Sequence, residues 1–414
     1  MSNVVPEGWA EFTQGDIANF SNGRAYKLTE WEKAGTPVIR LQNLTGSGKD
    51  FYYSNLQLPK RQYCHDGDLL YMWSATFGPH IWKGPKAIYH YHIWKITCNE
   101  IDVTKSYLYQ LLEFKTEEWL NKSNGMGILH ITKGGMEELK LVLPPLPEQK
   151  KIAAILTSVD DVIEKTQAQI DKLKDLKTGM MQELLTRGVG VDGKPHTEFK
   201  DSPVGRIPKG WEVSSLGELI SVMESGWSPQ CHSEQAMLGE WCILKTTAIQ
   251  WHGFDYLANK KLPSSLVPRA EIQVKKEDVL VTRAGPADRV GVVSYVESVP
   301  SKVMLSDKII RIRTLNNCRS DFLSLWLSGE FSQRFMASRV SGLATSQTNI
   351  SQSILRSVPC VVPSLEEQAI ISNTIFSINR KIERTQKKFT AQLSLKKALM
   401  QDLLTGKVRV KVED

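Results

Sequence analysis

Two segments of the chain, residues 148–186 and 367–405, carry apolar side chains at alternating spacings of four and three. This spacing, held over more than five heptads, predicts two long α-helices with an a/d seam, as in a coiled coil. Polar residues interrupt both seams at the same register, which fixes register at some cost in stability. The first seam comprises Ile152, Leu156, Val159, Ile163, Thr166, Ile170, Leu173, Lys177, Met180 and Leu184. The second comprises Ile371, Ile375, Ile378, Ile382, Thr385, Phe389, Gln392, Lys396, Leu399 and Leu403.

The two helical segments are copies of one another. They align without a gap at an offset of 219 residues, and 15 of 39 positions are identical. The likeness extends upstream, because PEGW at residues 6–9 corresponds to PKGW at residues 208–211. A fixed period of this kind indicates a duplicated architecture. We therefore expect two long helices that pack as an antiparallel coiled coil about a pseudo-two-fold axis, each preceded by a globular block.

Each globular block is predicted to be a mixed α/β domain with short strands, so that the fold class is α+β. Residues 69–73, 87–96, 279–282 and 290–296 are the candidate strands. A stretch rich in Gly and Pro after the first helix is typical of a linker. The predicted order is a first domain over residues 1–145, a helix over 146–187, a linker over 188–207, a second domain over 208–363, a helix over 364–406 and a tail over 407–414.

The composition is that of an ordinary globular protein, with 41% hydrophobic and 23% charged residues among 414. No apolar run is long enough for a membrane helix, and the N-terminus lacks the features of a signal peptide. Six scattered cysteines form no C-x-x-C pair and are typical of reduced thiols, which favours a cytoplasmic protein without a disulfide framework or zinc site. The net charge of +7 permits a polyanionic partner without establishing one.

Several motifs resemble catalytic or ligand sites but lack the necessary context. Residues 188–193 fit G-x-G-x-x-G, yet they follow a helix rather than a strand, and Pro195 stands where a P-loop needs a hydroxyl. The adjacent Asp160 and Asp161 are better explained as part of a solvated helix face. His90 and His92 on a predicted strand could bind a metal, although no acid or cysteine stands at a suitable spacing. We therefore predict neither a catalytic nor a metal-binding residue.

Two pairs of loops carry side chains suited to DNA contacts. Residues 73–83 and their counterpart 283–289 supply aromatic, hydroxyl and basic groups, and arginine is the side chain best suited to bidentate contact with guanine. Residues 124–130 and 341–349 precede the helices and combine glycine with amide, hydroxyl and imidazole groups. The alternative is that a given side chain merely caps a turn. The predicted DNA-binding residues are Trp73, Ser74, Thr76, His80, Lys83, His130, Lys133, Arg283, Arg289, Ser346, Gln347 and Asn349.

In these features the chain resembles a specificity subunit of a type I restriction–modification system. LPPLPEQ at residues 143–149 opens the first helix, MQELLT at 181–186 closes it, and MQDLLTG at 400–406 closes its copy. GDLL at residues 67–70, followed by Trp73 and Ser74, resembles the target-recognition signature. The second copy departs from it, with Glu277 in place of the glycine and Arg283 in place of the tryptophan.

The resemblance implies two target-recognition domains, each of which reads one half of a split, asymmetric sequence in double-stranded DNA. It implies that the helices act as a spacer and as a dock for two methyltransferase subunits, which restriction subunits then join. S-adenosylmethionine, ATP and magnesium would belong to those partners, and this chain would hold no cofactor.

Three functions remain open from the sequence. The chain is a non-catalytic DNA-reading subunit, an enzyme fused to its own reader, or a coiled-coil adaptor that binds only proteins. Cutting or methylation by the isolated chain would favour the second, and loss of DNA sequence preference with intact partner binding would favour the third.

Overall fold

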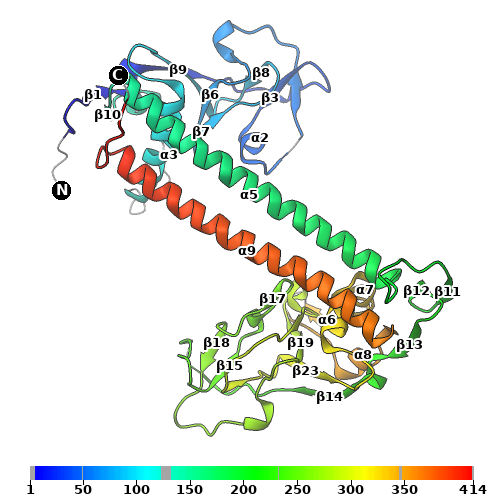
Figure 1. Cartoon of the computed structure of the whole chain (residues 1–414). Helices are drawn as coiled ribbons and strands as arrows, with labels where there is room; N and C mark the ends of the chain where they lie inside the picture. The colour runs from blue at the N-terminus through cyan, green and yellow to red at the C-terminus, as the bar shows by residue number, and fades with distance from the viewer. Residues whose placement is uncertain (1–4, 49, 123–131, 232, 345–346, 413–414) are drawn as a thin grey trace. The chain divides into compact units, whose positions relative to one another are not determined.

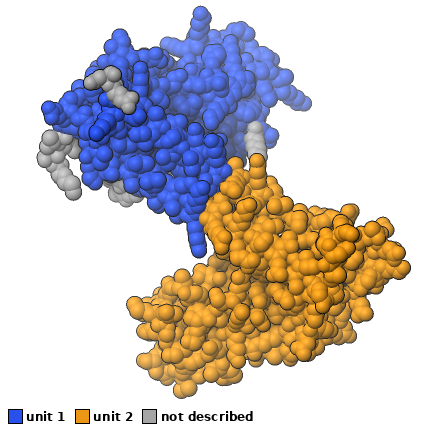
Figure 2. All heavy atoms as spheres, viewed as in Figure 1, with its two compact units in different colours: residues 1–167, 387–414 blue, residues 168–386 orange. Residues whose placement is uncertain are grey.

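The computed structural model describes residues 5–48, 50–122, 132–231, 233–344 and 347–412. Its contacts divide the chain into two units (Figure 2). Unit 1 comprises residues 1–167 and 387–414, and unit 2 comprises residues 168–386. Each unit therefore contains one globular domain together with part of both long helices.

Unit 1 is built on two four-stranded sheets, ordered β2-β9-β6-β7 and β4-β3-β8-β5 (Figure 1). The first sheet is antiparallel, and the second contains the parallel pair β3–β8. Strand β1 pairs with β10 and so joins the N-terminal segment to the start of the first long helix. The strands are β1 Ala10–Thr13, β2 Ala18–Asn22, β3 Thr36–Ile39, β4 Tyr52–Ser54, β5 Tyr63–Cys64, β6 Leu69–Ser74, β7 Thr76–Ile81, β8 Ala87–Tyr89, β9 Ile93–Cys98 and β10 Lys140–Leu143. The helices are α1 Gln14–Ile17, η1 Leu28–Glu30, α2 Leu41–Thr45, η2 Lys60–Gln62, α3 Lys105–Lys122 and α4 Lys133–Glu137.

Unit 2 repeats this plan with a three-stranded mixed sheet in place of the four-stranded one. Its main sheet is ordered β14-β23-β19-β21, its mixed sheet is ordered β18-β15-β22, and β13 pairs with β26 as β1 pairs with β10. The strands are β11 Phe199–Ser202, β12 Gly205–Pro208, β13 Glu212–Ser215, β14 Ile220–Ser225, β15 Cys242–Leu244, β16 Ile249–Gln250, β17 Gly253–Phe254, β18 Asn259–Lys261, β19 Val279–Thr282, β20 Ala284–Gly285, β21 Val293–Tyr295, β22 Val303–Met304, β23 Ile309–Thr314, β24 Ser341–Ala344, β25 Gln347–Asn349 and β26 Pro359–Val362. The helices are η3 Leu216–Glu218, η4 Thr246–Ala248, η5 Ala270–Ile272, η6 Ala287–Arg289, α6 Ser320–Ser328, α7 Glu330–Ala337 and α8 Gln352–Arg356.

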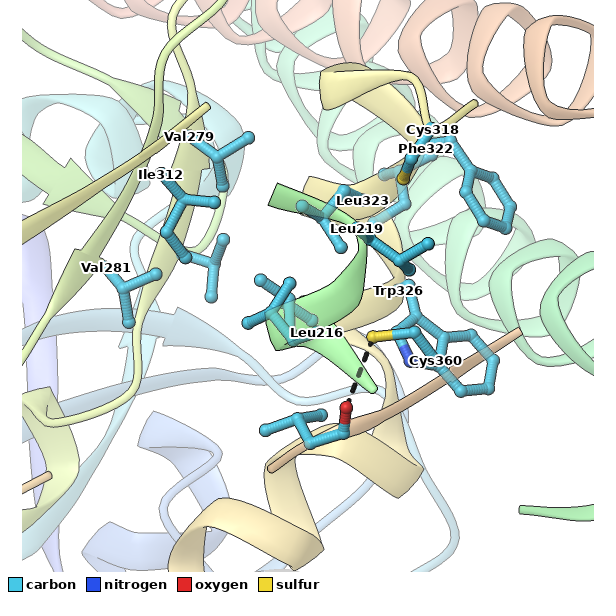
Figure 3. Close-up of a cluster of buried hydrophobic side chains, with 14 of the residues drawn as sticks. Leu216, Leu219, Val279, Val281, Ile312, Cys318, Phe322, Leu323, Trp326 and Cys360 are labelled. Carbon is cyan, nitrogen blue, oxygen red and sulfur yellow. Dashed lines mark hydrogen bonds between the residues drawn. The ribbon is translucent and has the colours of Figure 1, made fainter. Parts of the chain in front are cut away.

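The core of each unit lies where its main sheet meets a helix. In unit 2, Val279 and Val281 of β19 face Phe322, Leu323 and Trp326 of α6 across buried leucines (Figure 3). All four residues of β19 are buried. A central strand that is covered on both faces has a nearly continuous apolar sequence, without the alternation of a half-exposed strand.

The two long helices are α5 Leu146–Thr186 and α9 Leu365–Leu403. In unit 1, Ile152 near the start of α5 shares a core with Leu403 at the end of α9. In unit 2, Leu184 near the end of α5 shares a core with Ile371 near the start of α9. The helices therefore run antiparallel within each unit. Every position of the two predicted seams is buried or half-buried, including Thr166. The predicted fold class, two mixed α/β domains with two long antiparallel helices and an internal repeat, is confirmed.

The predicted strand over residues 87–96 was wrong, because the chain turns at 90–92 and the two halves, β8 and β9, join different sheets. The apolar pattern continues through the turn and therefore hides it. The candidate over 290–296 contracts to β21.

The predicted loop over residues 73–83 is instead mostly the hairpin β6–β7. Ala75 turns the hairpin with a φ of 58°, and Pro79 is tolerated because β7 is an edge strand. The second predicted loop, residues 283–289, contributes β20 and η6, and the loop over 341–349 forms the hairpin β24–β25.

The predicted linker contains a hairpin, β11–β12, whose turn uses Gly205 at a φ of 101°. Ile207 of this hairpin is 2% exposed and belongs to the core of unit 2. The predicted tail likewise contributes Arg409 and Val410 to unit 1. The linker was predicted from its glycine and proline content, and the burial of Ile207 packs its end into the core of unit 2.

Candidate nucleic-acid interface

A buried glutamate in the first turn of each long helix ties the helix to its domain. In unit 1, Glu148 accepts a hydrogen bond from Trp9 Nε1 at 3.3 Å and two from the guanidinium of Arg409, each at 2.7 Å. In unit 2, Glu367 accepts from Trp211 Nε1 at 2.9 Å and lies 2.8 Å from His196 Nε2. The duplicated tryptophan thus has the same partner in both units.

The glutamine that follows each glutamate holds the start of an earlier helix of the same domain, α3 in unit 1 and α6 in unit 2. Gln149 accepts from the backbone of Thr104 at 2.9 Å and donates to the carbonyl of Asp102 at 2.7 Å. Gln368 makes the same pair of bonds with the backbone of Arg319 and Asn317, at 2.8 and 3.2 Å. The Glu-Gln pair therefore locks each domain onto its helix.

The GDLL signature at residues 67–70 is a turn that aims the strand β6. The backbone of His65 donates to the Asp68 carboxylate at 2.9 Å, and Gly67 has a φ of 83°. In unit 2, Lys275 donates to Asp278 at 2.8 Å, and Glu277 has a φ of 71°. The two turns are therefore equivalent in backbone geometry although glycine has become glutamate.

These turns place Trp73 and Arg283 at corresponding ends of their strands. The backbone N–H of Trp73 donates to the carbonyl of His92 at 3.2 Å, and that of Arg283 donates to Lys308 at 2.9 Å. The two acceptor residues, His92 and Lys308, directly precede the neighbouring strands β9 and β23. The structure therefore makes Trp73 equivalent to Arg283, and His92 equivalent to Lys308.

At this position unit 1 carries an aromatic cluster, which we define as Trp73, His90, Tyr91 and His92. Trp73 Nε1 donates to the carbonyl of Tyr91 at 2.9 Å. The ring centroids of Tyr91 and His92 are 3.8 Å apart, and those of His90 and Tyr91 are 4.5 Å apart. Burial, reinforced by the electrostatic effect of the neighbouring His92 and Arg40, lowers the pKa of His90 to about 4. The cluster therefore presents a ring-lined surface in which the His90 imidazole is neutral at pH 7 and Tyr91 is 39% exposed.

The other candidates on the hairpin lie beside the cluster or farther along β7. Ser74 is half-buried and Thr76 is exposed, on either side of the turn at Ala75. Burial lowers the pKa of His80, which lies farther along β7. The exposed Lys83 lies 4.0 Å from Glu164 of α5.

Unit 2 carries basic groups at the equivalent position. Strand β25 pairs with β20, so the structure brings the two predicted loops, 283–289 and 341–349, into one small sheet. Arg283 lies half-buried at its start, next to the exposed Lys308. Arg289 is engaged in the fold itself, because its Nη2 donates to the carbonyls of Thr246 and Ile249 at 3.0 and 2.8 Å.

The remaining candidates divide by position. Lys133 lies on α4, away from the hairpin in sequence, and pairs with Glu137 at 3.4 Å. Asn349 lies on β25, opposite Ala284. Gln347 belongs to the same strand by its backbone. His130 and Ser346 lie outside the described residues.

Sequence patterns missed part of the surface. The sequence suggested His90 and His92 only as possible metal ligands, and it gave no reason to single out Tyr91 or Lys308. Each lies in the turn before β9 or β23, and this turn becomes visible only once the strands are paired. Among the described residues no group of three or more His, Cys, Asp or Glu could hold a metal, and all six cysteines are free thiols. Within the same residues, no helix combines the length and apolar character that a membrane crossing requires.

Comparison with known proteins matches this architecture to one family. Residues 6–175 and 208–393 each match the model of the type I restriction modification DNA specificity domain. The two matches cover most of the chain and coincide with its two copies. The chain therefore belongs to this family.

Its relatives are specificity subunits of type I restriction enzymes. The EcoEI subunit of Escherichia coli is 35% identical over 269 residues, which are 64% of this chain and 44% of that subunit. The MjaVIII subunit of Methanocaldococcus jannaschii is 27% identical over 419 residues, covering 98% of this chain and 94% of that one. The solved S subunit from M. genitalium shares the fold, with a TM-score of 0.63 at 13% identity over 97% of this chain and 98% of its own.

Proposed function

We propose that this chain is the non-catalytic DNA-reading subunit of a type I restriction–modification complex, and that each unit reads one half of a bipartite, asymmetric target. The observation that carries the proposal is the contrast between conserved anchoring and divergent reading positions within one chain. Glu148 and Glu367 make matching bonds, whereas the equivalent positions Trp73 and Arg283 differ in chemistry. A pair of readers for unlike sequences needs this combination.

The two surfaces suit different modes of base contact. Arg283 and Lys308 offer the donors that recognise guanine edges in the major groove and phosphates of the DNA backbone. The aromatic cluster of unit 1 offers apolar ring surface and the neutral imidazole of His90, which can contact a thymine methyl group or base edges. The other predicted contacts, Ser74, Thr76 and Asn349, lie next to these positions. Since the Nη2 atom of Arg289 is held by backbone carbonyls, we assign Arg289 a positioning role.

Three substitutions test this assignment in the assembled complex. Arg283→Ala should lower affinity by about 1–3 kcal/mol at one base pair and relax specificity there, as expected for a lost base contact. Lys308→Ala, the matched control for a phosphate contact, should weaken binding to all sequences alike and reduce the salt dependence. Trp73→Leu should alter only the other half-site. Selection of bound sequences from a random pool measures all three, and a change in both half-sites from either single variant would contradict independent readers.

We further propose that α5 and α9 act as a spacer between the half-sites. Each helix carries its seam over more than five heptads, as a stiff spacer requires, and DNA readers work at separations set by the helical repeat. Deleting one heptad from both helices should change the tolerated spacer length in the same selection and leave both half-sites intact. Unchanged spacer preference would exclude this role.

Docking of methyltransferase and restriction subunits, and the absence of catalysis in this chain, belong to the same proposal. The support is membership of a family whose relatives are specificity subunits. S-adenosylmethionine, ATP and magnesium would then be bound by the partners. The isolated chain, supplied with DNA, magnesium and S-adenosylmethionine, should neither cut nor methylate. Either activity, retained by a preparation free of other polypeptides, would favour an enzyme fused to its reader.

A further inference from the structure

The seam lysine of α9 is neutralised by two carboxylates in unit 1. Lys396 Nζ lies 2.7 Å from Glu113 of α3 and 2.7 Å from Asp160 of α5. Gln110 donates a further hydrogen bond to Asp160 at 2.7 Å. Burial alone would lower the pKa of Lys396, but the bonds to Asp160 and Glu113 raise it above its usual value. Unit 1 thus closes this position with its own side chains.

The repeat identifies the same position in unit 2. The offset of 219 between the helices makes Lys177 equivalent to Lys396, and Asn379 equivalent to Asp160. The matching glutamine bonds to Thr104 and Arg319 set an offset of 215 between α3 and α6. That offset makes Ser328 equivalent to Glu113. Unit 2 has therefore kept the cation and replaced both carboxylates with neutral groups.

A cavity of about 380 Å³ lies at this position in unit 2, lined by Lys177, Ser328 and Asn379 among others. No carboxylate oxygen among the described residues lies within the 4.0 Å of Lys177 Nζ that would make an ion pair. Burial lowers the pKa of Lys177, partly offset by the charge of Glu383. A half-buried ammonium beside an open cavity is a donor that gains from an anionic ligand.

The rest of the lining limits the size and charge of that ligand. Arg380 adds a second cation to the cavity, while Glu297 and Glu383 add two anions. The four charges sum to zero, so the cavity has no excess of positive charge to attract a polyanion such as DNA, and an anion gains mainly from direct contact with Lys177. A second cavity of about 720 Å³ shares Lys177, Met181 and Ser328, and its wall includes Phe331 and other apolar side chains. A ligand with an apolar group beside its carboxylate would fill both spaces.

We propose that unit 2 holds a carboxylate-binding pocket at Lys177, which accepts an Asp or Glu side chain with an apolar neighbour from another polypeptide. Lys177 pairs with the incoming carboxylate and the Asn379 amide donates a hydrogen bond to it, in the place where unit 1 uses Asp160 and Glu113, while the Ser328 hydroxyl keeps its bond to the carbonyl of Ser324 at 2.8 Å. The site differs from the DNA-reading surface, so its test does not depend on sequence recognition. The asymmetry also gives a partner a means of distinguishing the two units.

The test uses the full chain labelled with ¹³C at its methionine methyl groups. Met181 lines both cavities, and its repeat equivalent Met400 lies in unit 1. The probe peptide acetyl-Leu-Glu-Phe-amide should shift the Met181 resonance saturably and leave Met400 unmoved. The neutral twin acetyl-Leu-Gln-Phe-amide should bind at least about tenfold more weakly, because it lacks the ion pair.

Matched variants complete the design. S328E together with N379D restores the carboxylates of unit 1 and should abolish the response at Met181. D160N together with E113S opens the equivalent position and should make Met400 respond. Equal shifts from both peptides, an equal response of Met400 in the wild type, or a stronger effect of inorganic phosphate would each overturn the proposal. The peptide titration needs only the wild-type chain, so the proposal can be tested even if a variant fails to fold. A wild-type chain that selects its DNA sequence normally but does not bind the peptide would contradict the pocket and leave the proposed function unaffected.

Discussion

One residue type in one register meets two different surroundings in this chain. Lys177 and Lys396 hold the same place in the duplicated seams, yet the second is paired with two carboxylates and the first faces a cavity. A cation that is partly removed from water costs free energy unless a partner compensates it. The same substitution should therefore have opposite consequences at the two positions.

Lys396→Met should destabilise the protein by about 1 kcal/mol, a modest value because Glu113 and Asp160 keep part of their contact with water. The matched change Lys177→Met should leave stability within about 0.5 kcal/mol or improve it. Since the pKa of Lys396 is raised, its contribution is present below the usual value of 10.5 and is lost as pH rises through the raised pKa. Urea unfolding at neutral and alkaline pH checks both points, and equal losses at neutral pH would argue against the pairing.

His90 in the aromatic cluster makes a second residue-scale prediction. Its pKa of about 4 in the folded protein, against 6.5 for an ordinary histidine, means that the unfolded chain binds a proton that the folded one refuses. Stability should therefore fall as pH drops from about 6.5 towards 4. His90→Gln should flatten this part of the profile, and NMR titration of the imidazole should give a midpoint near 4. A midpoint at or above 6.5 would mean that the ring lies in water.

A tight turn before the strand in each domain sets the position of the residue at the end of that strand. Gly67 and Glu277 both adopt a left-handed backbone just before the strands that carry Trp73 and Arg283. Only the first has the residue that this conformation favours. The turn in unit 2 therefore tolerates the strained backbone of Glu277, because the Asp278 carboxylate still closes the turn.

Gly67→Ala should destabilise unit 1 by about 1–2 kcal/mol through backbone strain alone, since a Cβ there would meet nothing within 4 Å. Gly179→Ala is the matched control, because Gly179 also faces open space but lies within helix α5. That change should stabilise the protein by about 0.5–1 kcal/mol. Thermal unfolding measures the two, and changes of the same sign would contradict the assigned backbone conformations.

At the scale of the molecule, unit 1 is assembled from both ends of the chain. Strand β1 pairs with β10, and Arg409 near the C-terminus binds Glu148 and the carbonyl of Glu7. In unit 2 the equivalent glutamate, Glu367, is bound in the same way by the segment that follows α5. In both units, therefore, the segment that follows one long helix binds the glutamate in the first turn of the other long helix.

Arg409→Ala should loosen unit 1 while sparing unit 2, because it removes two charge-assisted hydrogen bonds from a buried carboxylate. Hydrogen exchange should accelerate at β1 and β10 and remain unchanged at β13 and β26. Lys407→Ala, which affects an exposed pair with Asp402, is the control and should change neither. Equal acceleration in both units would show that the closure is not local.

Helical periodicity is written in neighbouring residues, so the sequence by itself determined the two long helices, their seams, the internal repeat and the family resemblance. It also placed Trp73 and Arg283 among the candidates, because aromatic and basic side chains follow apolar strands there. The sequence aligned Arg283 with Trp73, but only the tertiary structure showed that His92 and Lys308 lie beside them, since those bonds join strands that are far apart in the chain. The pocket at Lys177 likewise depends on which side chains α6 and α9 bring to it, and no local pattern encodes such long-range placement.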